Sequence, residues 1–282
     1  MRIKYLSIPA SLIALLSSIA IADSVTIVSS KDNTLFGDFF DDLSSGAGQG
    51  MYAGRTGASA KPNVLRRALI EFDLSAIPAN ATITSARLDV VCILSPDEVT
   101  REFTLHRLTT DWGEGASSSA GGAGAFAEPG DATWVYNFYA TSQWTNPGGD
   151  FVAQVSSSTE MEDAGEYSFP STDQMIDDIQ VWLDNPSSNF GWLIMGEEDV
   201  EKTARRIGTR EQIEETERPY LVVEYEIGGT PGDFTGDGQV DGADLGLMLA
   251  VWGTCPGCPE DLNGDGEVNG ADLGLLLAFW TL

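Results

Sequence analysis

The chain has 282 residues, with 43 acidic side chains against 15 lysines and arginines and a formal net charge of −28 at pH 7. Nucleic acids and anionic membrane surfaces carry charge of the same sign, so this balance argues against both as partners. The length is sufficient for one large domain together with a smaller one.

The first 22 residues have the pattern of a secretory signal peptide. Arg2 and Lys4 form a basic start, residues 5–22 are mostly apolar, and Ala20-Ile-Ala22 fits a cleavage site. We therefore predict cleavage after Ala22 and a secreted or cell-surface protein. Removal of two basic residues and no acid gives the mature chain a net charge of −30. No later segment approaches the run of about 18 apolar residues that spans a membrane.

Residues 23–227 are predicted to form one mainly β domain, an antiparallel sandwich of the jelly-roll kind. In 88–94 and 221–225 apolar side chains alternate with other residues, as in strands with one buried face. We expect Cys92, in the first of these runs, to be a buried thiol. The predicted strands are 25–29, 68–72, 83–94, 103–108, 132–140, 151–156, 190–195 and 221–227.

One peripheral helix is expected to interrupt these strands and to lie across an end or open face of the sandwich. Ser171 and Gln174 have the spacing of a capping box, and Pro186 would stop the helix. Between them, apolar residues recur at spacings of three and four. They are Met175, Ile176, Ile179, Trp182 and Leu183.

Several motifs spread along this domain occur together. They include Asp32-Asn-Thr-Leu35, Arg67-Ala-Leu-Ile-Glu-Phe-Asp-Leu-Ser-Ala-Ile-Pro78 and Arg218-Pro-Tyr-Leu-Val-Val-Glu-Tyr225. In these motifs the domain resembles the DNRLRE family of exported bacterial β-sandwiches. Related domains are grouped as carbohydrate-binding modules of family ninety-six, and some accompany alginate-degrading enzymes. The resemblance implies that this domain binds a polysaccharide.

Three aromatic residues are candidates for stacking on a sugar ring. Trp112, Tyr136 and Trp144 lie in or near predicted loops at one end of the strands. An aromatic face there can stack on a sugar while polar neighbours bond its hydroxyl groups. The alternative is that these rings belong to the core, where most aromatics of a β domain are found.

Three arginines are candidates for an acidic sugar. Arg205, Arg206 and Arg210 belong to residues 202–210, the basic cluster of an otherwise acidic domain. Guanidinium groups can bind a uronate or sulfate through paired hydrogen bonds. The alternative is internal salt bridges with the many acids.

Two further possibilities remain open in this domain. Asp32, Asn33, Asp41 and Asp42 offer oxygen ligands for an additional structural calcium ion. An enzyme is the alternative: His106, the one histidine, could serve a polysaccharide lyase, and a pair of acids could serve a glycoside hydrolase. The sequence contains no Gly-x-Ser-x-Gly elbow, HExxH helix or phosphate loop. We expect a non-catalytic polysaccharide-binding or adhesive protein, and a structural surface protein with a sorting tail is the other alternative.

Residues 228–232 are rich in glycine and form a predicted linker to the tail, residues 233–282. The tail contains Asp233-Phe-Thr-Gly-Asp-Gly-Gln-Val-Asp-Gly-Ala-Asp244 and, 28 positions later, Asp261-Leu-Asn-Gly-Asp-Gly-Glu-Val-Asn-Gly-Ala-Asp272. Each copy has oxygen-bearing residues at positions 1, 3, 5, 9 and 12 and a glycine at position 6, the pattern of a calcium loop of the EF-hand type.

These loops predict two bound calcium ions. The glycines at position 6, Gly238 and Gly266, allow the unusual φ that such a tight loop needs. A threonine at position 3 of the first loop predicts weaker binding there than in the second. The predicted ligands are Asp233, Thr235, Asp237, Gln239, Asp241 and Asp244 in the first loop, and Asp261, Asn263, Asp265, Glu267, Asn269 and Asp272 in the second.

One apolar run follows each loop, residues 245–252 and 273–280. A duplicated loop with only its exiting helix resembles a type I dockerin, the module that docks on cohesin domains in bacterial polysaccharide-degrading assemblies. The resemblance implies a small α-helical domain and a cohesin-like or cell-surface partner. The runs lack the polar and basic residues that dockerins present to cohesins. Six apolar side chains of the two runs are expected to pack together across the two halves of the tail. They are Leu247, Leu249, Trp252, Leu275, Leu277 and Trp280.

Two cysteines, Cys255 and Cys258, lie between the two loops. In an exported chain they are candidates for a local disulfide. Two cysteines do not make a zinc site, and a thioredoxin-like redox motif would need a βαβ context.

Overall fold

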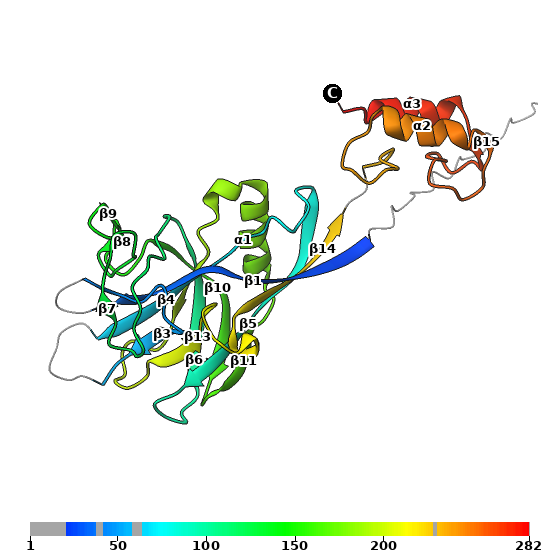
Figure 1. Cartoon of the computed structure of the whole chain (residues 1–282). Coiled ribbons are helices and arrows are strands. Elements are labelled where there is room, and N and C mark those ends of the chain that lie inside the picture. Colours follow the sequence, from blue (N-terminus) through cyan, green and yellow to red (C-terminus); the bar gives the residue numbers. More distant parts are fainter. Residues whose placement is uncertain (1–20, 38–41, 58–63, 228–229, 282) are drawn as a thin grey trace, which may run out of the picture. The chain divides into compact units, whose positions relative to one another are not determined.

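The computed structural model describes residues 21–37, 42–57, 64–227 and 230–281 (Figure 1). Residues 1–20 of the predicted signal peptide therefore lie outside the described residues. Contacts within the chain define one compact unit over Ala22–Glu226 and a second that includes Ile227–Leu282. Each unit is considered by itself below.

The larger unit is built on one sheet of ten strands. Six of these form a closed antiparallel ring in the order β1, β14, β5, β13, β3, β4, because β4 pairs back onto β1. These six are β1 (Ile21–Phe36), β3 (Gly50–Arg55), β4 (Leu65–Phe72), β5 (Ala81–Leu94), β13 (Arg205–Gly208) and β14 (Tyr220–Ile227).

The ring turns its corners at two irregular positions. The register between β1 and β4 shifts between Ser29 and Lys31, which bends β1 where it passes from β14 to β4. β3 changes partner at Gly54, whose φ of 115° is left-handed. A Cβ at Gly54 would lie 2.9 Å from backbone atoms of Thr203 and Ala204, so a glycine permits this corner.

The other strands extend the ring on both sides. β12 (Trp192–Met195), β6 (Arg101–Leu108) and β10 (Phe151–Met161) follow β4 in that order, and β11 (Gly165–Phe169) pairs with β5. Short ladders join β2 (Leu43–Ser44) to β7 (Ala125–Phe126) and β8 (Tyr136–Phe138) to β9 (Ser142–Gln143). The prediction of a mainly β domain of antiparallel strands is confirmed, but the sheet closes on itself, which a sandwich of two separate sheets does not.

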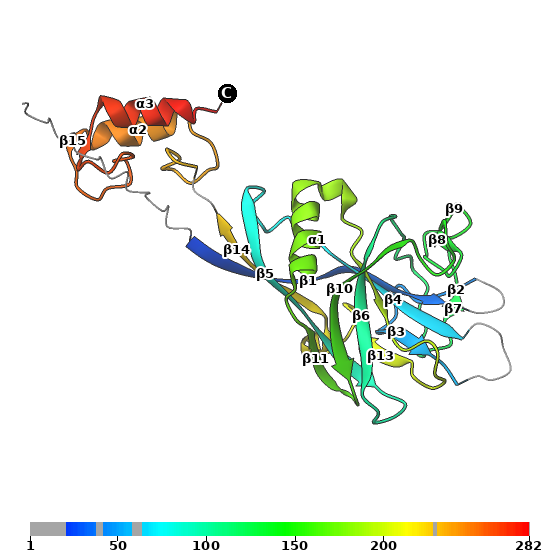
Figure 2. The same ribbon diagram turned by 180° about the vertical axis from the view of Figure 1, so that it is seen from behind.

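The predicted helix is present as α1 (Asp173–Asp184), and it packs on β5 and β10 (Figures 1 and 2). Its N-cap is Thr172, one residue later than predicted, and the Thr172 hydroxyl accepts the Met175 N–H at 3.0 Å. Buried on α1, Asp178 accepts hydrogen bonds from Ser156 of β10 and Trp192 of β12. Single 3₁₀ turns occur at Pro186–Ser188 and Glu215–Glu217.

The smaller unit contains two nine-residue helices, α2 (Gly242–Ala250) and α3 (Gly270–Ala278), and a short ladder between β15 (Gly253–Thr254) and β16 (Glu267–Val268). Its core is small. Val240 and Val268 precede the two helices, and Met248 and Leu276 point inward from them. None of the helices in the described part of the chain has the length and apolar character needed to cross a membrane.

Candidate functional site

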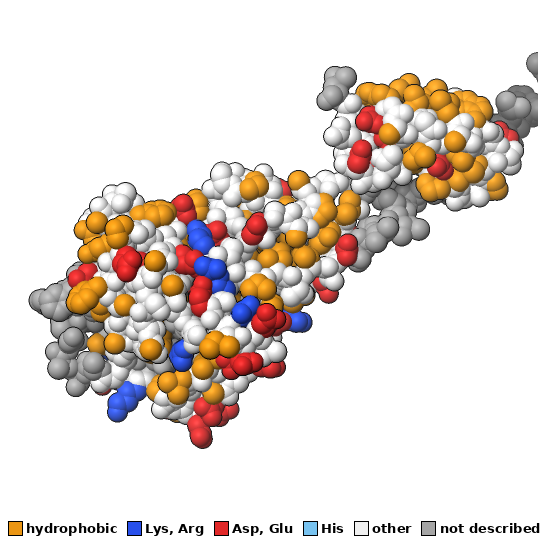
Figure 3. All heavy atoms as spheres, in the orientation of Figure 1, with side chains coloured by type: hydrophobic (Ala, Val, Ile, Leu, Met, Phe, Trp, Pro, Cys, Tyr) orange, Lys and Arg blue, Asp and Glu red, His pale blue; other side chains and the backbone are white. Residues whose placement is uncertain are grey.

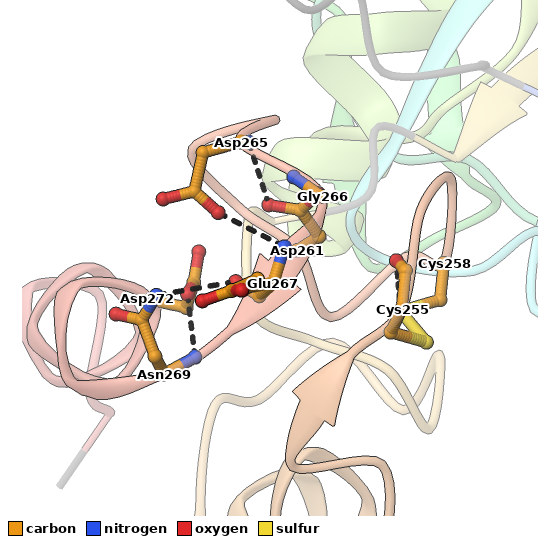
Figure 4. The surroundings of a disulfide bond; sticks show 8 residues. All are labelled: Cys255, Cys258, Asp261, Asp265, Gly266, Glu267, Asn269 and Asp272. Atoms are coloured by element: carbon orange, nitrogen blue, oxygen red, sulfur yellow. Dashed lines mark hydrogen bonds between the residues drawn. A yellow bond between two sulfur atoms is a disulfide. The ribbon is translucent and has the colours of Figure 1, made fainter.

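The two tail loops close in the same way. The carboxylate of the first residue turns inward and accepts backbone N–H groups from the middle of the loop. Asp233 accepts from Gly236 at 2.7 Å and Gly238 at 2.8 Å, and Asp261 accepts from Asp265 at 3.1 Å and Gly266 at 2.7 Å (Figure 4). The φ values of Gly238 and Gly266 are 84° and 86°, as predicted for position 6.

The carboxylate at position 12 joins the two ends of each loop. Asp244 accepts N–H groups of Phe234 at 2.8 Å and Thr235 at 2.9 Å and completes a capping box with Asp241. Burial by itself raises the pKa of Asp244, but these backbone hydrogen bonds outweigh it and hold the pKa below its usual value. Asp272 makes the corresponding bonds to Asn263 and Asn269.

The twelve predicted ligands therefore lie around two similar loops. Their donor atoms are all oxygens, which suits calcium better than a metal that prefers nitrogen or sulfur. In this conformation the carboxylates accept backbone N–H groups, and no three of them in the described tail bring oxygens within 4.8 Å of one another. Asp244, Asp261 and Asp272 are buried, Asp233, Asp241 and Asn269 are half-buried, and Thr235, Asp237, Gln239, Asn263, Asp265 and Glu267 are exposed.

The helices expose most of their apolar side chains. Of the six side chains expected to pack together, only Trp280 packs against the core, and the other five are exposed. Met248 and Leu276 face the core, and leucines one position away on either side must therefore point elsewhere, because successive helical residues are about 100° apart. The apolar atoms gather over α2 and α3 in Figure 3. Residues 38–53% exposed are Leu247, Leu249, Trp252, Leu275, Leu277 and Phe279.

A disulfide joins Cys255 and Cys258, whose Cα atoms are 5.7 Å apart, within the usual range for such a bond. It lies beside the second loop (Figure 4). The backbone N–H of Cys255 donates to the Gly266 carbonyl of that loop at 3.0 Å. Cys92, in β5, is buried and free.

In the larger unit, two of the three predicted stacking residues are in the core. Trp112 and Trp144 are 1% and 4% exposed, and their indole N–H groups donate to the carbonyls of Phe190 and Thr133. Neither ring presents a face to a ligand, so their prediction as stacking residues is corrected to a structural role. Tyr136 is half-buried, and its ring packs edge-on against Tyr139 at 5.5 Å.

The predicted arginine cluster is used mainly inside the protein. Arg205 is fully buried and donates to the carbonyls of Val99 and Glu162, and it is paired with Asp97. Arg210 forms salt bridges with two acidic side chains of the same unit, Glu114 and Glu211. Half-buried Arg206 donates to the Gln49 carbonyl. The internal salt-bridge alternative therefore describes Arg205 and Arg210.

His106 has no free nitrogen for catalysis in this structure. It is 7% exposed, its Nδ1 lies 3.1 Å from the Val152 carbonyl and its Nε2 lies 3.1 Å from the Thr104 hydroxyl. Burial lowers the pKa of His106 below its usual value, which keeps the ring neutral at pH 7.

A polar groove that the sequence did not predict lies on the larger unit. It has a volume of about 350 Å³ and is lined in part by Arg87, Asp89, Tyr167, Arg218 and Tyr220. The guanidinium of Arg87 is paired with Asp89 at 2.8 Å and remains exposed, and both tyrosine rings are half-buried. The alternation along 81–94 marks Arg87 and Asp89 as outward-facing, but only the fold brings Tyr167 and Tyr220 beside them.

A larger hollow of about 580 Å³ has a different character. The aromatic residues among those that line it, Phe72 and Trp182, are 1% and 2% exposed. A sugar ring could not stack on them without rearrangement. The smaller groove is therefore the better candidate for a glycan.

A second acidic cluster lies in the larger unit and consists of Asp32, Glu114 and Glu211. Burial raises the pKa of Asp32 well above its usual value, and the charge of Glu211 raises it further. Burial also raises the pKa of Glu211, although Arg210 offsets part of this effect.

Of Asp32, Asn33, Asp41 and Asp42, the residues considered for a structural calcium ion, only Asp32 belongs to this cluster. The amide of Asn33 is buried and bonded to Ser44 and to the Glu114 carbonyl, and Asp41 lies outside the described residues. The other two members of the observed cluster, Glu114 and Glu211, are far from Asp32 in the sequence.

Comparison of the chain with models of known protein families finds no match, and comparison with curated proteins finds no matching relative.

Proposed function

We propose that the protein is an exported, non-catalytic polysaccharide-binding or adhesive protein whose duplicated tail folds around two calcium ions and attaches it to another surface or assembly component. The tail is the observation that carries this proposal. Two repeated loops of oxygen donors each lead into a helix, and both helices expose leucines at equivalent positions of the repeat. Exposed apolar patches of this kind are typical of docking surfaces.

In this proposal, the loop carboxylates bind calcium instead of accepting backbone N–H groups of their own loop. The first loop would use Asp233, Asp237 and Asp244 with Thr235, Asp241 and the Gln239 carbonyl, and the second the six corresponding positions. Each exiting helix has nine residues, too few for stability alone. Metal binding and folding of the tail are therefore coupled, and a cohesin-like or cell-surface protein would dock only on the calcium-loaded form.

The polar groove is where we place the polysaccharide. Tyr167 and Tyr220 offer ring faces, and Arg87 and Arg218 offer guanidinium groups that suit the carboxylate of a uronate or a sulfate. The Nε of Arg218 donates to the Gln212 carbonyl at 2.9 Å, and its Nη1 lies 3.6 Å from Glu215. This second, exposed pairing can be exchanged for an acidic sugar at little cost. This arrangement favours acidic over neutral polysaccharides.

Affinity electrophoresis of the full chain through gels containing acidic or neutral polysaccharides tests the groove. Arg87→Ala with Arg218→Ala should weaken retention by an acidic polysaccharide at least tenfold, since one charge-assisted hydrogen bond contributes about 1.5–3 kcal/mol and tenfold is about 1.4 kcal/mol. Lys202→Ala, which removes an exposed cation elsewhere, is the matched control. Equal retention of the double variant and the control would place the glycan outside this groove.

The attachment is tested on cells that produce the protein. Chelation of calcium should release the full chain from the cell-surface fraction, and a chain ending at residue 227 should be secreted freely while keeping its polysaccharide affinity. Unchanged retention of the truncated chain would contradict a docking role for the tail. Loss of polysaccharide binding on truncation would contradict the assignment of the glycan site to the larger unit.

A further inference from the structure

Three segments that are distant in the sequence meet at one end of the β ring. Asp32 lies in β1, Glu114 lies in the connection between β6 and β7, and Glu211 follows β13. One carboxylate oxygen from each residue lies within 4.8 Å of those of the other two. A single calcium ion at about 2.3–2.6 Å from each oxygen requires them to be no more than about 5 Å apart, and the cluster meets this condition.

The cluster contains buried oxygen atoms that no protein donor satisfies. Asp32 is fully buried, and its Oδ1 has no hydrogen-bond partner. Its Oδ2 accepts the backbone N–H of Arg210 at 2.9 Å and the Ser29 hydroxyl at 3.3 Å. The Oε2 atom of Glu211 is also buried without a partner. Unpaired buried carboxylate oxygens are costly and rare, so they indicate a missing positive group.

The charges of the site support a divalent cation. Three carboxylates face one guanidinium, that of Arg210, which leaves a formal charge of −2. Arg210 donates to Glu114 from Nε at 2.8 Å and from Nη2 at 2.5 Å, and its Nε also lies 3.0 Å from Oε1 of Glu211. The Oδ1 of Asp32 and the Oε2 of Glu211 remain without a partner, and a divalent ion beside them would bring the site to neutrality.

We propose that Asp32, Glu114 and Glu211 form a calcium site in the larger unit, separate from the tail loops. Oxygen ligands with an excess of negative charge are those that calcium prefers. The ion would tie together β1, the connection that contains Glu114 and the connection that follows β13. The competing explanation is a proton shared between Asp32 and Glu211, whose carboxyl groups lie close enough to bond.

Calorimetric titration with CaCl₂ tests the site in a full chain whose tail loops are disabled by Asp233→Ala, Asp237→Ala, Asp261→Ala and Asp265→Ala. One ion should bind per chain, and Glu211→Gln or Asp32→Asn added to this background should abolish binding. Glu160→Gln, which alters an exposed acid elsewhere, should leave binding unchanged. Titration with MgCl₂ should give at least tenfold weaker binding.

Thermal unfolding gives a second measurement in the same background. Calcium at a hundredfold excess over its Kd should shift the folding equilibrium about a hundredfold toward the folded state, and Glu211→Gln should remove the shift while near-ultraviolet circular dichroism still reports a folded chain. No binding in the background chain would overturn the proposal and favour the shared proton. Binding that survives both Asp32→Asn and Glu211→Gln, or equal affinity for magnesium, would overturn it as well.

Discussion

Replacement of Asp178 by alanine should destabilise the larger unit far more than the same change at its exposed neighbour Asp177. Asp178 is 1% exposed and holds three strands to the helix. Its carboxylate accepts from the Ser156 hydroxyl at 2.5 Å and the Trp192 indole N–H at 3.0 Å, and it pairs with Arg107 at 3.0 Å. These partners belong to β10, β12 and β6 respectively.

The magnitude follows from what the substitution leaves behind. Ser156 and Trp192 are buried, so each would keep a donor without an acceptor, at a cost of about 1–3 kcal/mol apiece. Arg107 is 28% exposed at its side chain and can turn to water, so its loss contributes less. We expect Asp178→Ala to lower the free energy of unfolding by about 3–5 kcal/mol and Asp178→Asn, which keeps one acceptor oxygen, by about half as much.

Urea unfolding followed by tryptophan fluorescence measures this difference, because Trp182 and Trp192 pack at 4.6 Å beside the changed residue. Asp177→Ala is the matched control, since it makes the same change at an exposed position of the same helix and should have an effect within about 0.5 kcal/mol of zero. If the two alanine variants unfold at the same urea concentration, the hydrogen bonds of Asp178 do not stabilise the unit as argued.

Two further predictions concern pH and calcium. Because the folded protein lowers the pKa of His106, the unfolded chain takes up a proton first, and stability should fall as the pH drops below about 6.5; a His106→Gln variant that shows the same loss of urea midpoint between pH 7.5 and 5.5 would contradict this. In the tail, Asp261→Ala with Asp265→Ala should remove more of the calcium-induced helix signal in circular dichroism than Asp233→Ala with Asp237→Ala, because the first loop has a hydroxyl where the second has an amide carbonyl. The reverse order would contradict the ranking of the loops.

The features predictable from the sequence are those with local causes. The helix at Asp173–Asp184 follows from its apolar spacing and from Pro186, and the left-handed glycines of the tail follow from the loop pattern. The strand Arg205–Gly208 is not predicted, because a strand is recognised by alternating apolar and polar residues and this one begins with two arginines. Arg205 is buried only because carbonyls from two other segments meet its guanidinium, and such long-range partners leave no trace in local sequence.

The candidate sites show the same limit. The tail loops could be predicted because all their ligands lie within twelve residues of one another. The groove and the acidic cluster could not, since Arg87 and Tyr220, or Asp32 and Glu211, come together only when the ring has formed. The core positions of Trp112 and Trp144 were equally hidden, because composition does not tell an aromatic residue of the surface from one of the core.

The pairing of β1 with β14 has a consequence for how the protein is made. These are the first and last strands of the larger unit, so its ring contains neighbours about 200 residues apart in the chain. Contacts of such long range form slowly, because a large loop must close before they contribute. The ring cannot close until residues 220–227 have been synthesised. In the proposed export, a chain that crosses the membrane during its synthesis would pass β1 through before β14 exists, so its ring would close on the far side.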